Sequence, residues 1–159
     1  MDLSQERLRE LLDYDLLSGV FKWKVSTARR IKVGDVAGSP KRFGHLQIMV
    51  DGRFYKAHRL AWLYVHGRWP VEQIDHINGM PSDNRITNLR EVTCAENQQN
   101  QRSKPNKLLG VSWHTKSNKW QARILVHGVL KHLGVFVTPK EAHVAYVAAK
   151  HEYHPFGTL

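Results

Sequence analysis

An acid and a histidine, Asp75 and His76, are adjacent near the end of a short apolar run. The polar loop that follows is rich in Asn and Asp. After this loop the chain can return as a strand, and Thr93 can cap a helix that carries Asn97. Such a strand, loop, strand and helix would bring oxygen ligands and one imidazole together. This combination suits a hard divalent cation and a base that activates water.

Four sequence elements in this region resemble the HNH endonuclease motif, also called the ββα-metal motif, of phage-encoded and homing nucleases. They are Asp75-His76-Ile77-Asn78-Gly79, Asp83-Asn84-Arg85, Asn88-Leu89-Arg90 and Asn97. The spacing agrees with the motif, because Asn88 lies 12 residues after His76 and Asn97 lies 9 residues after Asn88. The last position of the motif is Asn here rather than His, a variant that the homing branch of the family also shows.

The resemblance implies a role for each motif position in hydrolysing a phosphodiester bond. Asp75 and Asn97 would hold one Mg²⁺ or Mn²⁺, and His76 would be the general base, for which its imidazole must be neutral. Asn88 would hold the loop and help to orient His76. The other Asn and Asp residues of the loop are expected to bond local backbone amides in its turn. Taken alone, Asp75 and His76 could also be a stray polar pair at the end of a strand.

The chain is basic, with 24 Lys and Arg against 14 acidic residues and a formal net charge of +10. This balance favours a polyanionic partner such as nucleic acid, although a basic protein without such a partner would share it. The single cysteine, Cys94, excludes an internal disulfide and a zinc site built from cysteines of one chain. The sequence has neither a membrane-spanning apolar run nor a signal-peptide pattern, so a reducing, cytoplasmic setting is expected.

The residues before the motif predict a basic, mostly antiparallel platform followed by a helix. The expected elements are a helix at 3–12, a strand at 20–25, strands at 45–50 and 53–57, and a helix at 57–66. Asp51-Gly52 is typical of a tight hairpin turn between two strands. On the second helix, His58 and His66 could be metal ligands, but satisfied structural histidines are the expected interpretation.

A polar, basic and proline-containing segment at 103–108 is expected to be a linker. Beyond it the pattern changes, and three strands are predicted at 110–114, 119–126 and 129–136. Thr138, Pro139 and Glu141 have the pattern of a capped helix start, and a stripe of small residues follows on this helix. Three strands and one helix form a small α+β unit.

The segment from Leu109 to about Lys150 resembles the plant-type AP-two/ERF DNA-binding domain. The matching residues are Gly110-Val111, Lys119-Trp120, Ala122, Ile124, Leu133-Gly134, Phe136, Thr138, Glu141-Ala142 and Ala145-Tyr146. In that family the sheet lies in the major groove, so the resemblance implies that this sheet binds duplex DNA. Ser112 and Leu125 depart from the family, which often has Arg at such positions.

Alternation along the strand 119–126 assigns its side chains to two faces. Trp120 and every second residue after it should pack under the helix, and the residues between them should face outward. The residues expected to contact DNA are Lys119, Gln121, Arg123, Trp113 or His114, and His132 on the sheet, with Arg85 and Arg90 in the HNH-like region. The alternative is an ordinary solvent face, for which the exposed Leu125 would be unusual.

These features together predict an α+β protein with a nuclease domain at 1–102, a linker at 103–108 and a DNA-binding domain at 109–159. In the first domain, antiparallel strands and a helix would lead into a ββα-metal core at about 71–102. In the second, a three-stranded antiparallel sheet would pack on one helix. The expected activity is metal-dependent nicking of double-stranded DNA by a monomer or weak dimer. The alternatives are a DNA-binding protein with an inactive nuclease site and an enzyme that cleaves RNA.

Overall fold

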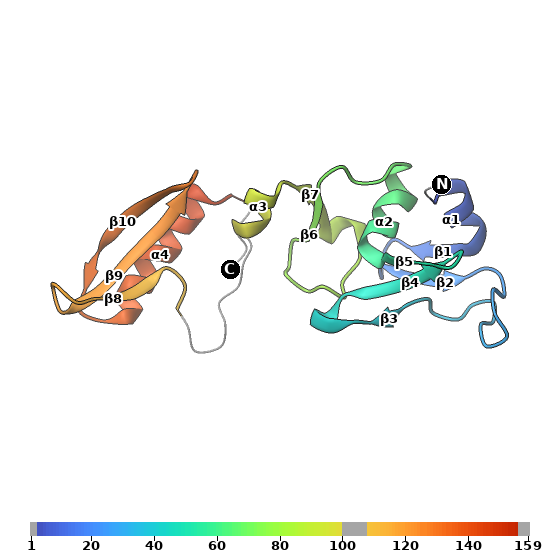
Figure 1. The fold of residues 1–159 in the computed structure, drawn as a ribbon, viewed down its shortest axis with the longest axis horizontal. Coiled ribbons are helices and arrows are strands. Elements are labelled where there is room, and N and C mark those ends of the chain that lie inside the picture. The colour runs from blue at the N-terminus through green and yellow to red at the C-terminus, as the bar shows by residue number, and fades with distance from the viewer. Residues whose placement is uncertain (1–2, 100–107, 156–159) are drawn as a thin grey trace. The chain divides into compact units, whose positions relative to one another are not determined.

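The computed structural model describes residues 3–99 and 108–155, which contain four α-helices and several small antiparallel sheets (Figure 1). This mixture confirms the α+β fold class. The chain divides into two units, Met1–Cys94 and Ala95–Leu159. Within the described residues, no helix combines the length and the apolar character needed to cross a membrane.

The first unit begins with a helix and two antiparallel sheets. Its elements are α1 (Gln5–Leu11), β1 (Leu12–Asp15), β2 (Val20–Trp23), β3 (Ser39–Pro40), the 3-10 turn η1 (Arg42–Gly44), β4 (Leu46–Val50), β5 (Arg53–Lys56) and α2 (Ala57–His66). β1 pairs with β2, and β4 lies between β3 and β5. The hairpin turn at Asp51-Gly52 is as predicted. Strand β1 was not predicted, because its buried Leu12 and Tyr14 continue the apolar pattern of the helix before them.

Apolar side chains from these elements form one buried core. Leu8 of α1, Ile48 of β4 and Leu60 of α2 are each at most 1% exposed. Burying each of these side chains stabilises the fold by about 2 kcal/mol relative to leaving it exposed. The core therefore holds α2 firmly, and α2 is the element from which His58 and Arg59 extend.

A two-stranded ribbon follows α2. Strand β6 (Gln73–His76) pairs antiparallel with β7 (Leu89–Val92), and the 3-10 turn η2 (Ile86–Asn88) precedes β7. Helix α3 (Cys94–Gln99) begins directly after Thr93. The predicted order of strand, loop, strand and helix is therefore present. All of α3 except its first residue belongs to the second unit.

The second unit is a three-stranded antiparallel sheet with a helix packed against it. Its remaining elements are β8 (Val111–His114), β9 (Lys119–Val126), β10 (Val129–Phe136) and α4 (Pro139–Tyr153), with β9 central in the sheet. Ala122 and Ile124 of β9 are buried together with Ala142 of α4. Thr138 and Glu141 form the predicted capping box, each side chain accepting a bond from the other's backbone N–H at 3.2 Å. The expected linker at 103–108 lies outside the described residues, except for Leu108.

Gly110 provides a test of how tightly α4 packs on this sheet. It has φ +72°, and a Cβ atom added there would lie 1.9 Å from the Tyr146 ring. We expect Gly110→Ala to destabilise the second unit by about 2–3 kcal/mol more than Gly128→Ala, because overpacking adds to the shared backbone strain. Gly128 is a matched control, since it has φ +78° and nothing within 4 Å of the added atom. The measurement is hydrogen exchange of the β8–β10 amides, and equal effects would show that Tyr146 moves aside at little cost.

Candidate active site

The ribbon places Asp75 and His76 at the end of β6, beside the start of β7. Asp75 lies opposite Arg90, and His76 lies opposite Leu89. The two residues are 8% and 5% exposed. Buried polar groups require partners, so the bonds around these two side chains define what the site can do.

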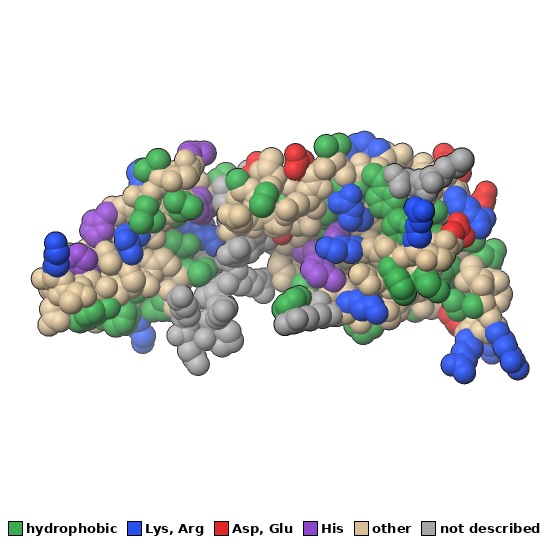
Figure 2. Space-filling model, viewed as in Figure 1, with side chains coloured by type: hydrophobic (Ala, Val, Ile, Leu, Met, Phe, Trp, Pro, Cys, Tyr) green, Lys and Arg blue, Asp and Glu red, His purple; other side chains and the backbone are tan. Residues whose placement is uncertain are grey.

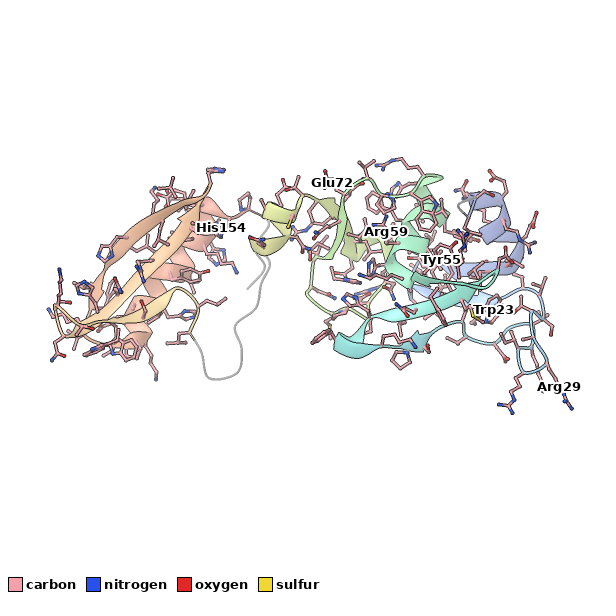
Figure 3. The ribbon with its side chains drawn as sticks, viewed as in Figure 1. Trp23, Arg29, Tyr55, Arg59, Glu72 and His154 are labelled. Atoms are coloured by element: carbon pink, nitrogen blue, oxygen red, sulfur yellow. The ribbon has the colours of Figure 1, made fainter. Side chains whose placement is uncertain are left out.

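Charged side chains from α2 and from β7 form hydrogen bonds with the segment that leads into β6. Arg59 of α2 donates hydrogen bonds to the carbonyl oxygens of Pro70 and Glu72 at 3.2 and 3.5 Å (Figure 3). Glu91 of β7 accepts hydrogen bonds from the Glu72 N–H at 2.9 Å and from Arg68 at 2.8 Å. The bond from Arg68 is the main reason that the pKa of Glu91 falls to about 2. These bonds hold the start of β6 beside the end of β7, at the end of the ribbon opposite the loop.

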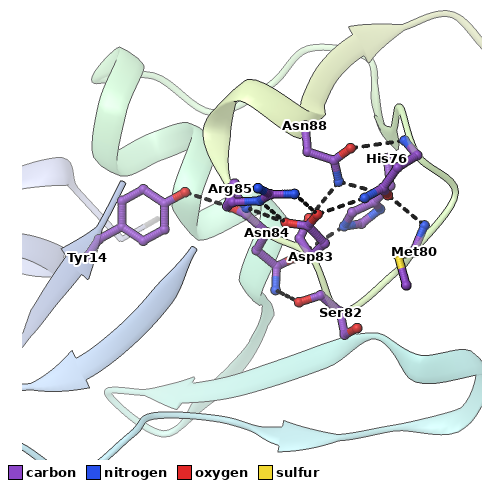
Figure 4. A network of polar contacts seen from close by, with 9 residues as sticks. Tyr14, His76, Met80, Ser82, Asp83, Asn84, Arg85 and Asn88 are labelled. Carbon is purple, nitrogen blue, oxygen red and sulfur yellow. Dashed lines mark hydrogen bonds and ion pairs between the residues drawn. The ribbon is translucent and has the colours of Figure 1, made fainter. Parts of the chain in front are cut away.

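The loop between β6 and β7 is held by bonds among its own polar side chains. Asn88 accepts a bond from the Asn78 N–H at 2.9 Å, and its amide donates to the Asn78 side-chain oxygen at 3.0 Å and to the Asp83 carbonyl at 2.8 Å (Figure 4). The Asn78 amide donates to the Asp83 carboxylate at 2.7 Å. Asn88 thus closes the loop onto the start of β7. This arrangement agrees with a loop-holding residue, and the catalytic part of its role stays a prediction.

The amide in contact with the His76 ring is that of Asn84. Its side-chain oxygen lies 3.3 Å from His76 Nε2, while its amide nitrogen donates to the Ser82 carbonyl at 3.2 Å. Asn84 is 1% exposed, and the Tyr14 hydroxyl donates to its carbonyl oxygen at 2.6 Å (Figure 4). Sequence reasoning gave Asn84 only a turn role. Nothing in the sequence separates it from the neighbouring Asn and Asp residues of the loop.

This contact decides which nitrogen of His76 carries the proton. Because the Asn84 oxygen accepts, Nε2 must donate, and Nδ1 is then the unprotonated nitrogen of the neutral ring. Burial lowers the pKa of His76, and the contact with Asn84 and the charge of Asp75 offset this effect in part. Neutral imidazole is therefore the favoured form at neutral pH, as a general base requires.

The Asp75 carboxylate is a hard oxygen donor, which fits Mg²⁺ or Mn²⁺. Its Oδ2 atom accepts two hydrogen bonds from Arg90, at 3.0 Å from Nε and 2.7 Å from a terminal nitrogen. Arg85 likewise binds both carboxylate oxygens of Asp83, and this bond is the main reason that the pKa of Asp83 falls to about 2. Of the three arginines that were expected to contact DNA, the two in this region, Arg85 and Arg90, therefore bind acidic side chains. Asn97 lies on α3 within the second unit, and its role as a metal ligand stays a prediction.

Three histidines from separate elements lie close together, and one of them is the predicted base, His76. His45 precedes β4, His58 lies in the first turn of α2, and His76 ends β6; one ring nitrogen of each lies within 4.8 Å of the others. Burial is the main reason that the pKa of His58 falls to about 3. Its Nδ1 atom has no hydrogen-bond partner in the described part of the chain, so the expectation of a satisfied histidine is not met at this nitrogen. His66 instead packs on the Trp62 ring, with centroids 4.2 Å apart.

The strand register separates the DNA-contact candidates of the C-terminal sheet. Trp113 lies opposite Trp120, edge-on at 5.2 Å, and so shares the side of the sheet on which α4 packs. The other candidates share the outer face and are Lys119, Gln121, Arg123, His114 and His132. Arg123 and Leu125 are both exposed on this face. On the surface in view in Figure 2, Lys, Arg and His side chains lie over both units.

Residues 55–99 match a family model described as HNH endonuclease. The matched segment runs from β5 to α3 and contains Asp75, His76, Asn84 and Asn88. Searches among curated proteins and among solved structures found no match. The family match supports an HNH endonuclease, and with it a divalent-metal-dependent nuclease that acts on DNA. The match ends before the C-terminal sheet, whose resemblance to AP-two/ERF domains stays a prediction.

Gly19 tests whether the position of Asn84 matters for cleavage. Gly19 has φ +71°, and an added Cβ atom would lie 2.4 Å from the backbone nitrogen of Arg85 and 2.5 Å from the carbonyl carbon of Asn84. Gly19→Ala must therefore push the loop backbone away, and we expect cleavage of plasmid DNA to fall by about 100-fold, the effect of a misplacement of roughly 1 Å. Gly52→Ala is the matched control, with φ +78° and nothing within 4 Å. Equal rates for two folded variants would contradict the expected link between this loop and catalysis.

Proposed function

We propose that this chain is a metal-dependent HNH endonuclease that nicks duplex DNA, with His76 as the general base. The observation that carries the proposal is the contact of the buried Asn84 with the His76 ring, inside the segment that matches the HNH family. The contact gives the ring one orientation and one tautomer before substrate binds. A base held in this way can remove a proton from water without first being reoriented.

Each side chain of the ribbon and loop has a separate part in the proposed reaction. His76 takes a proton from water through Nδ1 while Nε2–H stays bonded to Asn84. Asp75 and Asn97 would hold Mg²⁺ or Mn²⁺, which when bound stabilises charge on the phosphate and the leaving oxygen. With so few protein ligands, the ion is expected to bind more tightly once a DNA phosphate completes its shell. Asn88 holds the loop through its bonds to Asn78 and Asp83.

Nicking is proposed because each chain carries one such site. A monomer or weak dimer with one site cuts one strand in each encounter. Paired sites in a stable dimer would cut both strands. The form of the DNA product therefore reports how the chains assemble.

The outer face of the C-terminal sheet is proposed to bind the same duplex. This face presents cationic and hydrogen-bonding side chains, among them Arg123, while the other face is occupied by α4. A net charge of +10 favours such binding. The exposed Leu125 would be costly in water and useful against the methyl groups of a DNA groove.

One observation favours a second candidate, a DNA-binding protein with an inactive nuclease site. Arg90 already donates two hydrogen bonds to one carboxylate oxygen of Asp75. If this ion pair keeps the divalent cation out, the chain would bind DNA without cutting it. A DNA mobility shift without metal-dependent nicking would establish this candidate.

The general-base role is tested with supercoiled plasmid in Mg²⁺, Mn²⁺ or EDTA. We expect wild-type protein to give open circles only with metal, and His76→Ala to lose about 100-fold to 10,000-fold in rate, the usual contribution of a general base. His151→Ala is the control, since His151 is exposed on α4. DNA binding of His76→Ala should remain. Equal losses of binding and cleavage would mean that His76 supports the structure rather than the reaction.

The sheet is tested by Arg123→Ala in the full chain. If Arg123 contacts a phosphate, its loss should weaken duplex binding and lower the slope of log affinity against log salt by about 1. Lys140→Ala removes the same charge from α4 and should leave the slope nearly unchanged. The measurement is fluorescence anisotropy of a labelled duplex at several salt concentrations. Identical slopes for the two variants would remove the outer face from the proposed interface.

A further inference from the structure

His45, His58 and His76 form a triangle of rings whose size can be compared with that of a metal site. The ring centroids are 5.3 Å apart for His45 and His58, 5.1 Å for His58 and His76, and 5.8 Å for His45 and His76. Imidazole nitrogens lie about 2.0–2.1 Å from Zn²⁺, so three such rings at tetrahedral angles have centroids roughly 5 Å apart. The three rings are therefore already spaced as they would be around one ion.

The nitrogens of this triangle include two that lack partners. Nδ1 of His45 and Nδ1 of His58 are buried without a hydrogen bond in the described part of the chain. A buried polar atom without a partner is costly, and such atoms in a folded protein call for an explanation. One ring nitrogen of each histidine lies within 4.8 Å of the others, and ring rotation would bring these nitrogens to the roughly 3.3 Å spacing of ligands on one tetrahedral ion.

The surroundings of His76 also suit a metal ligand. Its Nε2–H donates to Asn84, so the ring would bind a metal through Nδ1. Metal-binding histidines commonly donate their second N–H in this way, which fixes the tautomer and orients the ring. Asn84 would therefore serve the same purpose whether His76 binds a proton or a metal ion.

The ligand type favours one class of ion over another. The cluster offers three imidazoles and no carboxylate, and imidazole suits Zn²⁺, Co²⁺, Ni²⁺ and Cu²⁺ rather than Mg²⁺. Burial is the main reason that the pKa values of His45 and His58 are lowered. Protons therefore compete little with a metal for these rings near neutral pH.

We propose that His45, His58 and His76 form a binding site for Zn²⁺ or a chemically similar ion, and that its occupation stops DNA cleavage. The inhibition rests on the proposed function, because it requires that Nδ1 of His76 is the base. The binding of the metal ion does not rest on the proposed function. A metal on Nδ1 prevents that atom from accepting a proton, so excess Mg²⁺ at Asp75 would not restore cleavage.

The binding is tested without reference to cleavage, on the full chain freed of metal. Added Co²⁺ should give the intense visible absorption of tetrahedral coordination, and calorimetry should show one tight Zn²⁺ site per chain. His45→Ala and His58→Ala should each weaken Zn²⁺ binding by more than about 100-fold. This loss is larger than the one expected when a residue that only hydrogen-bonds a metal ligand is removed. Asn84→Ala should weaken it by about 10-fold to 100-fold.

Control variants separate this cluster from the other histidines of the chain. His132→Ala and His151→Ala should keep the Co²⁺ absorption and the tight site, since both residues are exposed in the second unit. Circular dichroism confirms that each variant is folded, and His45 is the safer of the two cluster variants because it is only half-buried. If Co²⁺ bound to wild-type protein gave only the weak absorption of octahedral coordination, the proposed site would be wrong. Unchanged Zn²⁺ affinity in folded His45→Ala would also contradict it.

The inhibition is tested with wild-type protein in excess Mg²⁺. Nicking should fall with a midpoint at the same Zn²⁺ concentration as binding. Tight Zn²⁺ binding with undiminished nicking would overturn the inhibition and leave the site. If wild-type protein never nicks DNA, the proposed function fails while the Co²⁺ and Zn²⁺ measurements still decide the site.

Discussion

Burial of the Asn84 side chain is the constraint on which the candidate active site depends. An amide that is 1% exposed must satisfy both its oxygen and its nitrogen, and it does so with the His76 ring and the Ser82 carbonyl. The Tyr14 hydroxyl fixes the backbone of the same residue. The position of the predicted base is therefore tied to β1, far away in the sequence, as well as to its own loop.

The carboxylates at this site are neutralised by ion pairs with arginines rather than by contact with water. Asp75 faces Arg90, Asp83 binds Arg85, and Glu91 binds Arg68. These pairs hold the ribbon and loop in place, although each exposed pair contributes little stability by itself. The pair at Asp75 also bears on function, because a divalent cation and a guanidinium favour the same carboxylate. The family match, and the burial that lowers the pKa of His76, favour an active enzyme over a silent one.

The three clustered histidines illustrate how one environment serves two chemistries. Burial opposes the charged form of an imidazole, which leaves a neutral ring able to accept either a proton or a metal ion. A hard cation at the carboxylate and a borderline ion at the imidazoles would not compete for the same atoms. Both would nevertheless act on one reaction, because His76 belongs to both sets of groups.

Local patterns were enough to predict the α+β class, the Asp51-Gly52 hairpin, helix α2 and the capping box before α4, since these depend on residues close in the sequence. The adjacent Asp75 and His76 were also evident from the sequence, and the family match supports the motif around them. Only the tertiary structure placed Asn84 against His76 and brought His45 and His58 beside it. These contacts join separate elements through burial in a shared core, and no spacing along the chain records which polar residues meet there.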